Sequence, residues 1–291
     1  MKLKYILSSY ILLILIMIVL FYKIKQLNVP QKRNLILGVI QNYSWEKIEP
    51  FFISLIKADF KLCDYVMFVN GLSDKTKEKL HYYGFKTIEI PNKYKRMTIT
   101  LSRHILYDEY LSNNTNKYNM VLHVDVRDSF FQRDLFEIYK NNKKPFIGVS
   151  IENGTLTNKI NSKWMKDIYG DNIYQIIQNE KIICGGALWG TADKFLEINR
   201  KIWEEIKMKL HKNSINDQSV TNYLIYYKNL FKDILIKSDI NSGPVMTVGL
   251  INYKNLSFDS EGNLLNYNGE KPSIIHQYDR INSLVEKAHN K

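Results

Sequence analysis

Residues 121–132 read Val-Leu-His-Val-Asp-Val-Arg-Asp-Ser-Phe-Phe-Gln, and they are the most informative part of the chain. The apolar run predicts a buried strand that ends at Asp125, with Asp128 in the turn that follows. Two carboxylates at the end of a buried strand can hold a hard cation against a phosphorylated ligand. The stretch therefore indicates a ligand site at the carboxyl edge of a sheet.

The same residues also permit a purely structural interpretation. Asp125 would then cap the turn, and Asp128 would pair with Arg127 or Arg133, because Asp is common after strands. His123 lies within the strand itself. We expect it to be a core histidine whose ring nitrogens are hydrogen-bonded.

Working outward from this stretch, apolar runs of strand length alternate with segments of helical spacing. Strand–helix alternation with short connections predicts an α/β, doubly wound sheet, mostly parallel, whose ligands sit beyond the carboxyl ends of its strands. Strands are expected at residues 34–40, 64–70, 85–90 and 119–125. Helices are expected at 45–56, from Ser73 to near Gly84, and at 99–110.

The second half of the chain has a looser pattern. Residues 182–190 are apolar and rich in glycine, residues 192–210 predict a long amphipathic helix, and 216–227 predict a shorter one. No linker rich in Pro, Gly or Ser divides residues 34–291, so we expect one catalytic domain with a first half at 34–150 and a second at 151–291.

The N-terminus predicts a membrane anchor. Residues 5–22 contain no charged side chain and are bracketed by lysines. As a helix they would be about 27 Å long, near the thickness of a hydrocarbon core. A cleavable signal peptide is the alternative, but no small residues follow the apolar run. We expect a single-pass anchor and short stem over residues 1–33, of the Golgi or endoplasmic reticulum type II kind if the source is eukaryotic.

Composition narrows the class of protein. The chain has 41 basic and 29 acidic residues, a net charge of +12, and two cysteines. Two cysteines exclude a disulfide framework or a zinc ribbon. Six basic residues and no acidic ones lie in residues 1–33, so the excess over the rest is mild. This suits an anionic ligand or a membrane surface, and no nucleic-acid recognition motif accompanies it.

Four motifs in order resemble those of the glycosyltransferases of the GT-A fold. They are the Asp motif at 125–128, Cys-Gly-Gly-Ala-Leu-Trp-Gly-Thr at 184–191, the pair Asp217-Gln218, and a late histidine, His276, in Ile-Ile-His-Gln-Tyr-Asp-Arg. The resemblance covers roughly residues 34–280. It implies a Rossmann-like first half that binds a nucleotide sugar, and an acceptor site in the second half for a glycan, lipid or protein.

The resemblance also implies roles for particular residues. A divalent metal, Mn²⁺ or Mg²⁺, would be held by Asp125, Asp128 and His276, where it stabilises the leaving diphosphate. Asp217 and Gln218 would act in catalysis, although a helix N-cap or first-turn acid is the ordinary role of such an Asp. The donor site would further include three residues, Arg103, Gly185 and Gly186. Arg103 could equally be a solvated helix charge, and the glycines could serve tight packing.

The Asp motif departs from the family pattern, because Arg127 stands where a second Asp is expected. Residues i and i+2 of a strand share a face, so Asp128 can join Asp125 only if the chain turns directly after Asp125. Arg127 could instead contact the diphosphate through its planar fork and make the metal less necessary.

Two other function classes remain open from the sequence. A metal-dependent phosphoesterase could use the same Asp and His residues, although it would want more ligands for two metals. A non-catalytic protein that binds glycans or partners on this scaffold is the third reading, and the missing second Asp favours it.

Overall fold

The computed structural model describes residues 14, 17 and 31–290 of the 291-residue chain. Arg33–Lys291 forms one compact unit. Apart from Ile14 and Met17, the expected anchor at residues 5–22 lies outside the described residues. Within the described part of the chain, no helix has the length and apolar character needed to cross a membrane.

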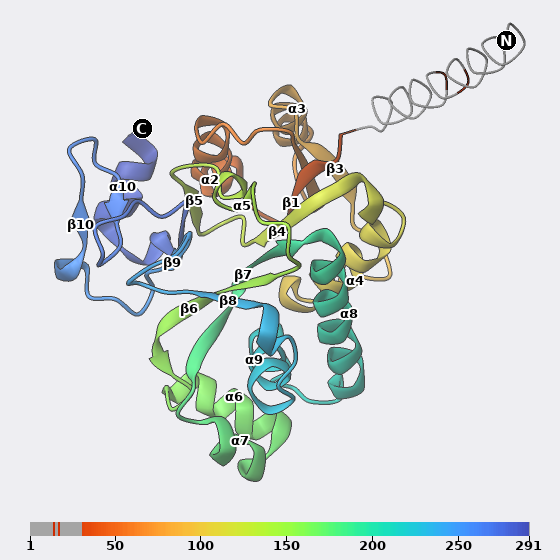
Figure 1. The fold of residues 1–291 in the computed structure, drawn as a ribbon, viewed down its shortest axis with the longest axis vertical. Helices are drawn as coiled ribbons and strands as arrows, with labels where there is room; N and C mark the ends of the chain where they lie inside the picture. Colours follow the sequence, from red (N-terminus) through yellow and green to blue (C-terminus); the bar gives the residue numbers. More distant parts are fainter. Residues whose placement is uncertain (1–13, 15–16, 18–30, 291) are drawn as a thin grey trace, which may run out of the picture. The chain divides into compact units, whose positions relative to one another are not determined.

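A central sheet organises the unit (Figure 1). Within residues 31–290 it has seven strands in the order β3-β2-β1-β4-β7-β6-β8. Neighbouring strands are parallel except at β7, which runs antiparallel to both β4 and β6. The strands are β1 (Arg33–Gln41), β2 (Cys63–Asn70), β3 (Lys86–Glu89), β4 (Tyr118–Val124), β6 (Ile147–Thr155), β7 (Lys181–Thr191) and β8 (Leu235–Ser238).

Helices cover both faces of this sheet. Side chains of β1 alternate: Leu35 and Leu37 pack in the core beneath α4 and α8, while Ile36 and Ile40 pack beneath α2 and α3. Figure 1 shows α4 and α8 side by side. The helices are α2 (Trp45–Lys57), α3 (Asp74–Tyr82), α4 (Ile99–Ser112), α5 (Phe136–Tyr139), α6 (Lys159–Tyr169), α7 (Asp171–Ile177), α8 (Ala192–Lys209), α9 (Asp217–Asn222) and α10 (Asn282–Asn290), with a π-helical turn at Tyr223–Tyr227.

A second, smaller sheet carries part of the site. It has the order β5-β12-β9, where β5 is Ser129–Phe131, β12 is Ile274–His276 and β9 is Val245–Thr247. Strand β12 therefore pairs with a segment that directly follows β4. A short hairpin, β10 (Ser257–Phe258) and β11 (Leu264–Leu265), completes the C-terminal region. The end of the chain thus packs back onto its first half.

The mostly parallel α/β sheet predicted from the sequence is confirmed, and its four expected strands agree with β1 to β4 within two residues at each end. The sequence pattern did not predict β6, β8, α6 or α7. It also missed two features that shape the site. Residues 182–190 are a long antiparallel strand, β7, and β12 joins the expected halves through β5. Both depend on pairing between distant segments, which hydrophobic periodicity does not report.

Candidate active site

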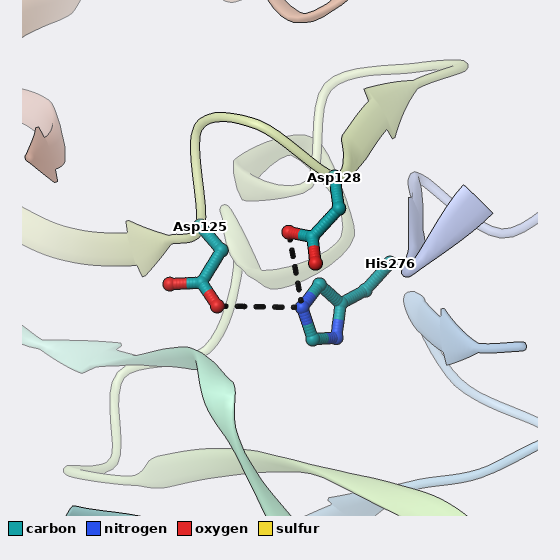
Figure 2. Close-up of side chains that lie close together, drawn as sticks. All are labelled: Asp125, Asp128 and His276. Atoms are coloured by element: carbon teal, nitrogen blue, oxygen red, sulfur yellow. Dashed lines mark ion pairs between the residues drawn. The ribbon is translucent and has the colours of Figure 1, made fainter. Parts of the chain in front are cut away.

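Asp125, Asp128 and His276 come together beyond the carboxyl end of β4 (Figure 2). The chain bends over residues 126–128, directly after Asp125, and this returns Asp128 toward Asp125. His276 Nε2 lies 3.7 Å from Asp125 Oδ2 and 3.6 Å from Asp128 Oδ1. One ligand atom from each of the three residues lies within 4.8 Å of the others. The turn that the +3 spacing requires is present.

Two of the atoms that face one another in this cluster lack hydrogen bonds. Asp128 Oδ1 and His276 Nε2 are buried, and neither has a hydrogen-bond partner in the described part of the chain. A Cβ at Gly186 would lie 2.3 Å from His276 Nε2 and 2.7 Å from Asp125 Oδ2, so only glycine leaves this space open. Carboxylate oxygens and one imidazole are ligands that suit Mn²⁺ or Mg²⁺. The residues fit a divalent cation.

The electrostatics of the cluster favour positive charge. Burial would raise the pKa of Asp125, but Arg103 and His276 outweigh it and hold this pKa well below its usual range. Burial raises the pKa of Asp128, and the opposing effect of His276, which lowers this pKa, is smaller. Burial also acts to lower the pKa of His276, yet the Cys184 sulfur and the two carboxylates raise it well above its ordinary value. The carboxylates therefore stabilise a cation at this point.

Arg103 links the cluster to the start of α9. Its guanidinium donates to Asp125 Oδ1 at 2.6 Å, to the Gly185 carbonyl at 3.0 Å and through Nε to Asp217 Oδ2 at 2.5 Å. Arg103 is 1% exposed and Asp217 is 2% exposed. Arg103 is therefore a buried bridge between two carboxylates, and the solvated helix charge considered from the sequence is wrong.

Asp217 contacts His104 as well as Arg103. Asp217 Oδ2 lies 3.2 Å from His104 Nε2, and the Nδ1 of His104 lies 2.9 Å from Asn199 Oδ1. Burial would raise the pKa of Asp217, but Arg103 and His104 lower it below the ordinary value. The N-cap of α9 is Asn216, which accepts from the Ser219 amide, so Asp217 is not the cap. A lowered pKa and two hydrogen bonds from the Arg103 guanidinium make this carboxylate a poor proton acceptor.

Gln218 and Gly185 join the start of α9 to β7 beside the cluster. Gln218 Oε1 accepts from the Gly185 amide at 3.1 Å, and its Nε2 donates to Asn161 Oδ1 at 2.9 Å. A Cβ at Gly185 would lie 3.0 Å from Asp217 Oδ1 and 3.3 Å from the Gln218 backbone. The start of α9 therefore packs directly on β7.

Arg127 lies at the rim rather than in the cluster. One guanidinium nitrogen lies 3.4 Å from Asp128 Oδ2 and 3.3 Å from Asp279 Oδ2. Its side chain is 45% exposed. The pairing of Arg127 with Asp128 considered from the sequence is present, but Asp128 still offers its other oxygen to the cluster.

A cavity of about 450 Å³ opens beyond the carboxyl ends of β1 and β2. Gly71 follows β2 with φ +69°, and a Cβ there would lie 2.0 Å from Asn42 Oδ1, so the wall requires glycine. Burial raises the pKa of Tyr43, and the charges of Arg127, Asp125, Asp128 and Asp279 also act on it, so this lining residue lies within electrostatic range of the cluster. The lining residues are Asn42, Tyr43, Ser44, Trp45, Glu46, Gly71, Ser73, Lys75, Thr76 and Lys79.

His123 is a core histidine, as predicted. Its Nδ1 lies 3.0 Å from the Tyr107 hydroxyl and its Nε2 lies 3.3 Å from the Gly185 carbonyl. Burial, with the charge of Arg103, lowers the pKa of His123 to about 3. The ring is neutral and serves packing beside the site.

Several residues at the site were missed from the sequence. His104 follows Arg103 on the helix, and Asp279 lies three residues after His276. Their closeness in sequence to predicted site residues could have identified them. Cys184 and Thr247 both lie next to His276 Nδ1, but only the fold brings them there. Thr247 sits in a three-residue strand that no pattern marks.

No protein-family model matches the sequence, and neither does any of the curated proteins searched. The fold is similar to two solved structures of the galactosyltransferase LgtC. One is a complex with donor and acceptor sugar analogues, at 14% identity and a TM-score of 0.54. The other is an active-site mutant, at 13% identity and a TM-score of 0.51. Each covers 88% of this chain and 95% of the LgtC chain. The chain therefore has the fold of the GT-A glycosyltransferases.

Proposed function

We propose that the protein is a glycosyltransferase that moves a sugar from a nucleotide-sugar donor to a glycan, lipid or protein acceptor with the help of Mn²⁺ or Mg²⁺. One observation carries the proposal. Asp125, Asp128 and His276 converge on an open point beyond the carboxyl end of β4, with unpaired buried ligand atoms, in a chain with the fold of a sugar transferase. Ligands of such sheets bind at this edge.

Within this proposal, Asp125, Asp128 and His276 hold the cation, which supplies Lewis-acid stabilisation of the charge that develops on the leaving diphosphate. Gly186 leaves that space clear because it has no side chain to fill it. Arg103 fixes Asp125 through Oδ1, so that Oδ2 stays turned toward His276. The chain thus presents a prearranged site rather than one assembled on binding.

Asp217 acts in the proposal as a positioning residue for Arg103. Its buried, charge-paired carboxylate does not suit a base. Gln218 holds the Gly185 amide and Asn161, and so sets the wall of β7 against which the donor sugar would lie. Both residues keep a place in the active site, but through the geometry that they impose.

The cavity beside Tyr43 is the place that we assign to the nucleoside of the donor. It has the size of a small-molecule site, Lys75 and Lys79 line it, and Tyr43 in its lining lies within electrostatic range of the cluster. Arg127 is exposed at the rim and has a planar fork of donors, so it suits the diphosphate between the cavity and the cluster. The acceptor would bind in the second half of the domain, residues 151–291.

We further assign a membrane location to the protein, through a single-pass anchor at residues 5–22. The support is the uncharged run of the sequence and its flanking lysines. In a eukaryotic source this would be a type II protein of the Golgi or the endoplasmic reticulum. An anchored enzyme would meet lipid-linked or membrane-bound acceptors.

The experiment is a screen of nucleotide sugars for hydrolysis and transfer, with Mn²⁺, Mg²⁺ or a chelator. We expect one donor to be cleaved with release of nucleoside diphosphate, and only with metal. Cleavage of simple phosphate esters instead would indicate a phosphoesterase. Glycan binding with no turnover of any donor would indicate a non-catalytic binding protein, and either result would refute the proposal.

A further inference from the structure

His276 has two ring nitrogens with different surroundings. Nε2 faces Asp125 and Asp128 and makes no hydrogen bond in the described part of the chain. Nδ1 lies 3.3 Å from the Thr247 hydroxyl and 3.5 Å from the Cys184 sulfur. A neutral imidazole carries its proton on one nitrogen, and the other nitrogen keeps the lone pair that binds a metal.

The small sheet fixes this arrangement. Thr247 of β9 and His276 of β12 are directly paired in the parallel register, so their side chains stand side by side. On the far side of Thr247, the Ser150 hydroxyl of β6 lies 2.5 Å from the Thr247 hydroxyl. Ser150 and Thr247 are fully buried and His276 is 1% exposed. A chain of buried polar groups therefore joins the central sheet to His276.

Only one placement of the protons along these hydrogen-bonded groups lets His276 bind a cation. If Nε2 is to offer its lone pair beside the two carboxylates, Nδ1 must carry the proton and donate it. The Thr247 oxygen is a better acceptor than the Cys184 sulfur. The Thr247 hydroxyl then donates to Ser150. Metal-binding histidines generally use such a second hydrogen bond to fix tautomer and ring orientation.

We infer that Thr247 and Ser150 form a buried hydroxyl relay that holds His276 in the tautomer and orientation that bind the divalent cation. Thr247 and Ser150 are positioning residues and touch neither donor nor metal. The inference rests on the cation of the proposed function. It adds two residues that no motif in the sequence marks.

Calorimetric titration of the full chain with Mn²⁺ alone tests the relay. Thr247→Val removes the hydroxyl at nearly constant volume and should raise the Kd for Mn²⁺ by about 10–100-fold. Thr247→Ser keeps the hydroxyl and should bind within about threefold of wild type. Ser150→Ala should weaken binding less than Thr247→Val, because Thr247 can still accept from Nδ1. Nitrogen NMR of the Mg²⁺-loaded chain should show the His276 proton on Nδ1.

Thr191→Val is the matched control. Thr191 is the last residue of β7, and its hydroxyl has no hydrogen-bond partner within the described residues. This variant should therefore bind Mn²⁺ as wild type does. Wild-type affinity in Thr247→Val overturns the relay, as does a Thr247→Ser variant that binds as weakly as Thr247→Val. If Thr247→Val does not fold, Ser150→Ala decides: an unchanged Kd overturns the relay and a raised Kd supports it.

The outcomes also separate the relay from the proposed function. Mn²⁺ binding that depends on Thr247, in a chain that cleaves no nucleotide sugar, would support the relay and refute the transferase. Metal-dependent transfer with wild-type affinity in Thr247→Val would refute the relay alone. A wild-type chain that binds neither Mn²⁺ nor Mg²⁺ would overturn both.

Discussion

Asp217→Asn should destabilise the protein far more than an ordinary substitution at the start of a helix. The carboxylate is 2% exposed, and its Oδ2 accepts from Arg103 and lies within 3.2 Å of His104. Asn keeps the shape and one acceptor oxygen but removes the charge that compensates the Arg103 guanidinium. The perturbation therefore leaves a buried cation with one carboxylate, Asp125, in place of two.

The size of the effect follows from this pairing. Breaking a buried ion pair from one side costs about 3–5 kcal/mol, because the remaining charge stays buried. Arg103 keeps Asp125, so we expect the lower end, about 3 kcal/mol. For a unit of this size, such a loss lowers the melting temperature by roughly 6–12 °C. Urea unfolding of wild type and Asp217→Asn at neutral pH measures it.

The difference in stability between wild type and Asp217→Asn should disappear at low pH. The pKa of Asp217 is lowered in the folded protein, so its charge contributes stability above the unfolded pKa of about 3.9, and the contribution is lost as pH falls through the folded pKa. The difference in unfolding free energy between wild type and Asp217→Asn should therefore be fully present at neutral pH and decrease below about pH 4.

Asp193→Asn is the control for this prediction. Asp193 is a first-turn acid on the exposed face of α8, and its substitution should change stability by less than about 0.5 kcal/mol. If Asp217 is instead a general base, Asp217→Asn would keep wild-type stability while turnover falls by about 10²–10⁴. That result would refute the positioning role.

Three further predictions concern the cluster and the N-terminus. Gly186→Ala should lower Mn²⁺ affinity by at least about tenfold, because its Cβ would lie 2.3 Å from His276 Nε2, whereas Gly154→Ala, which meets only side-chain methyls, should bind normally. Asp125→Asn should abolish transfer and metal-assisted donor binding, chelation should mimic it, and full activity in a chelator would contradict the metal assignment. Deleting residues 1–30 should leave a folded protein that no longer partitions into membranes, since the compact unit begins at Arg33, and membrane partitioning of the truncated chain would contradict the anchor.

The sequence predicted the first half of the fold because its signals are local. Alternation in β1 assigns Leu35 and Ile36 to opposite faces, and Ser73 caps α3 as a Ser before a helix should, accepting from the Thr76 amide. Pairing of distant segments left no such signal. Nothing in residues 274–276 indicates that they lie against β5 rather than against a strand of the central sheet.

The candidate site was predictable in its residue types but not in its connections. Asp125, Asp128 and His276 have side chains that bind metals, and the resemblance to GT-A glycosyltransferases brought them into one set, which the structure places together. Arg103 was assigned to the donor site and Asp217 to catalysis, yet their contact joins residues 114 positions apart. The charge state and the accessibility of Asp217 follow from that contact, so the choice between base and positioning residue required the fold.

The departure from the Asp-x-Asp pattern has a physical explanation in the small sheet. An Asp at +2 shares a strand face with the first Asp, whereas an Asp at +3 needs a turn. Here the chain bends after Asp125 and enters β5 at Ser129, which pairs with His276, so Asp128 is carried to the histidine by the register of β5 and β12. The residue at +2, Arg127, is thereby turned to the rim, where Asp279 matches its charge. Arginine at this position is compatible with a cation site because the bend separates its guanidinium from the point where Asp125, Asp128 and His276 converge.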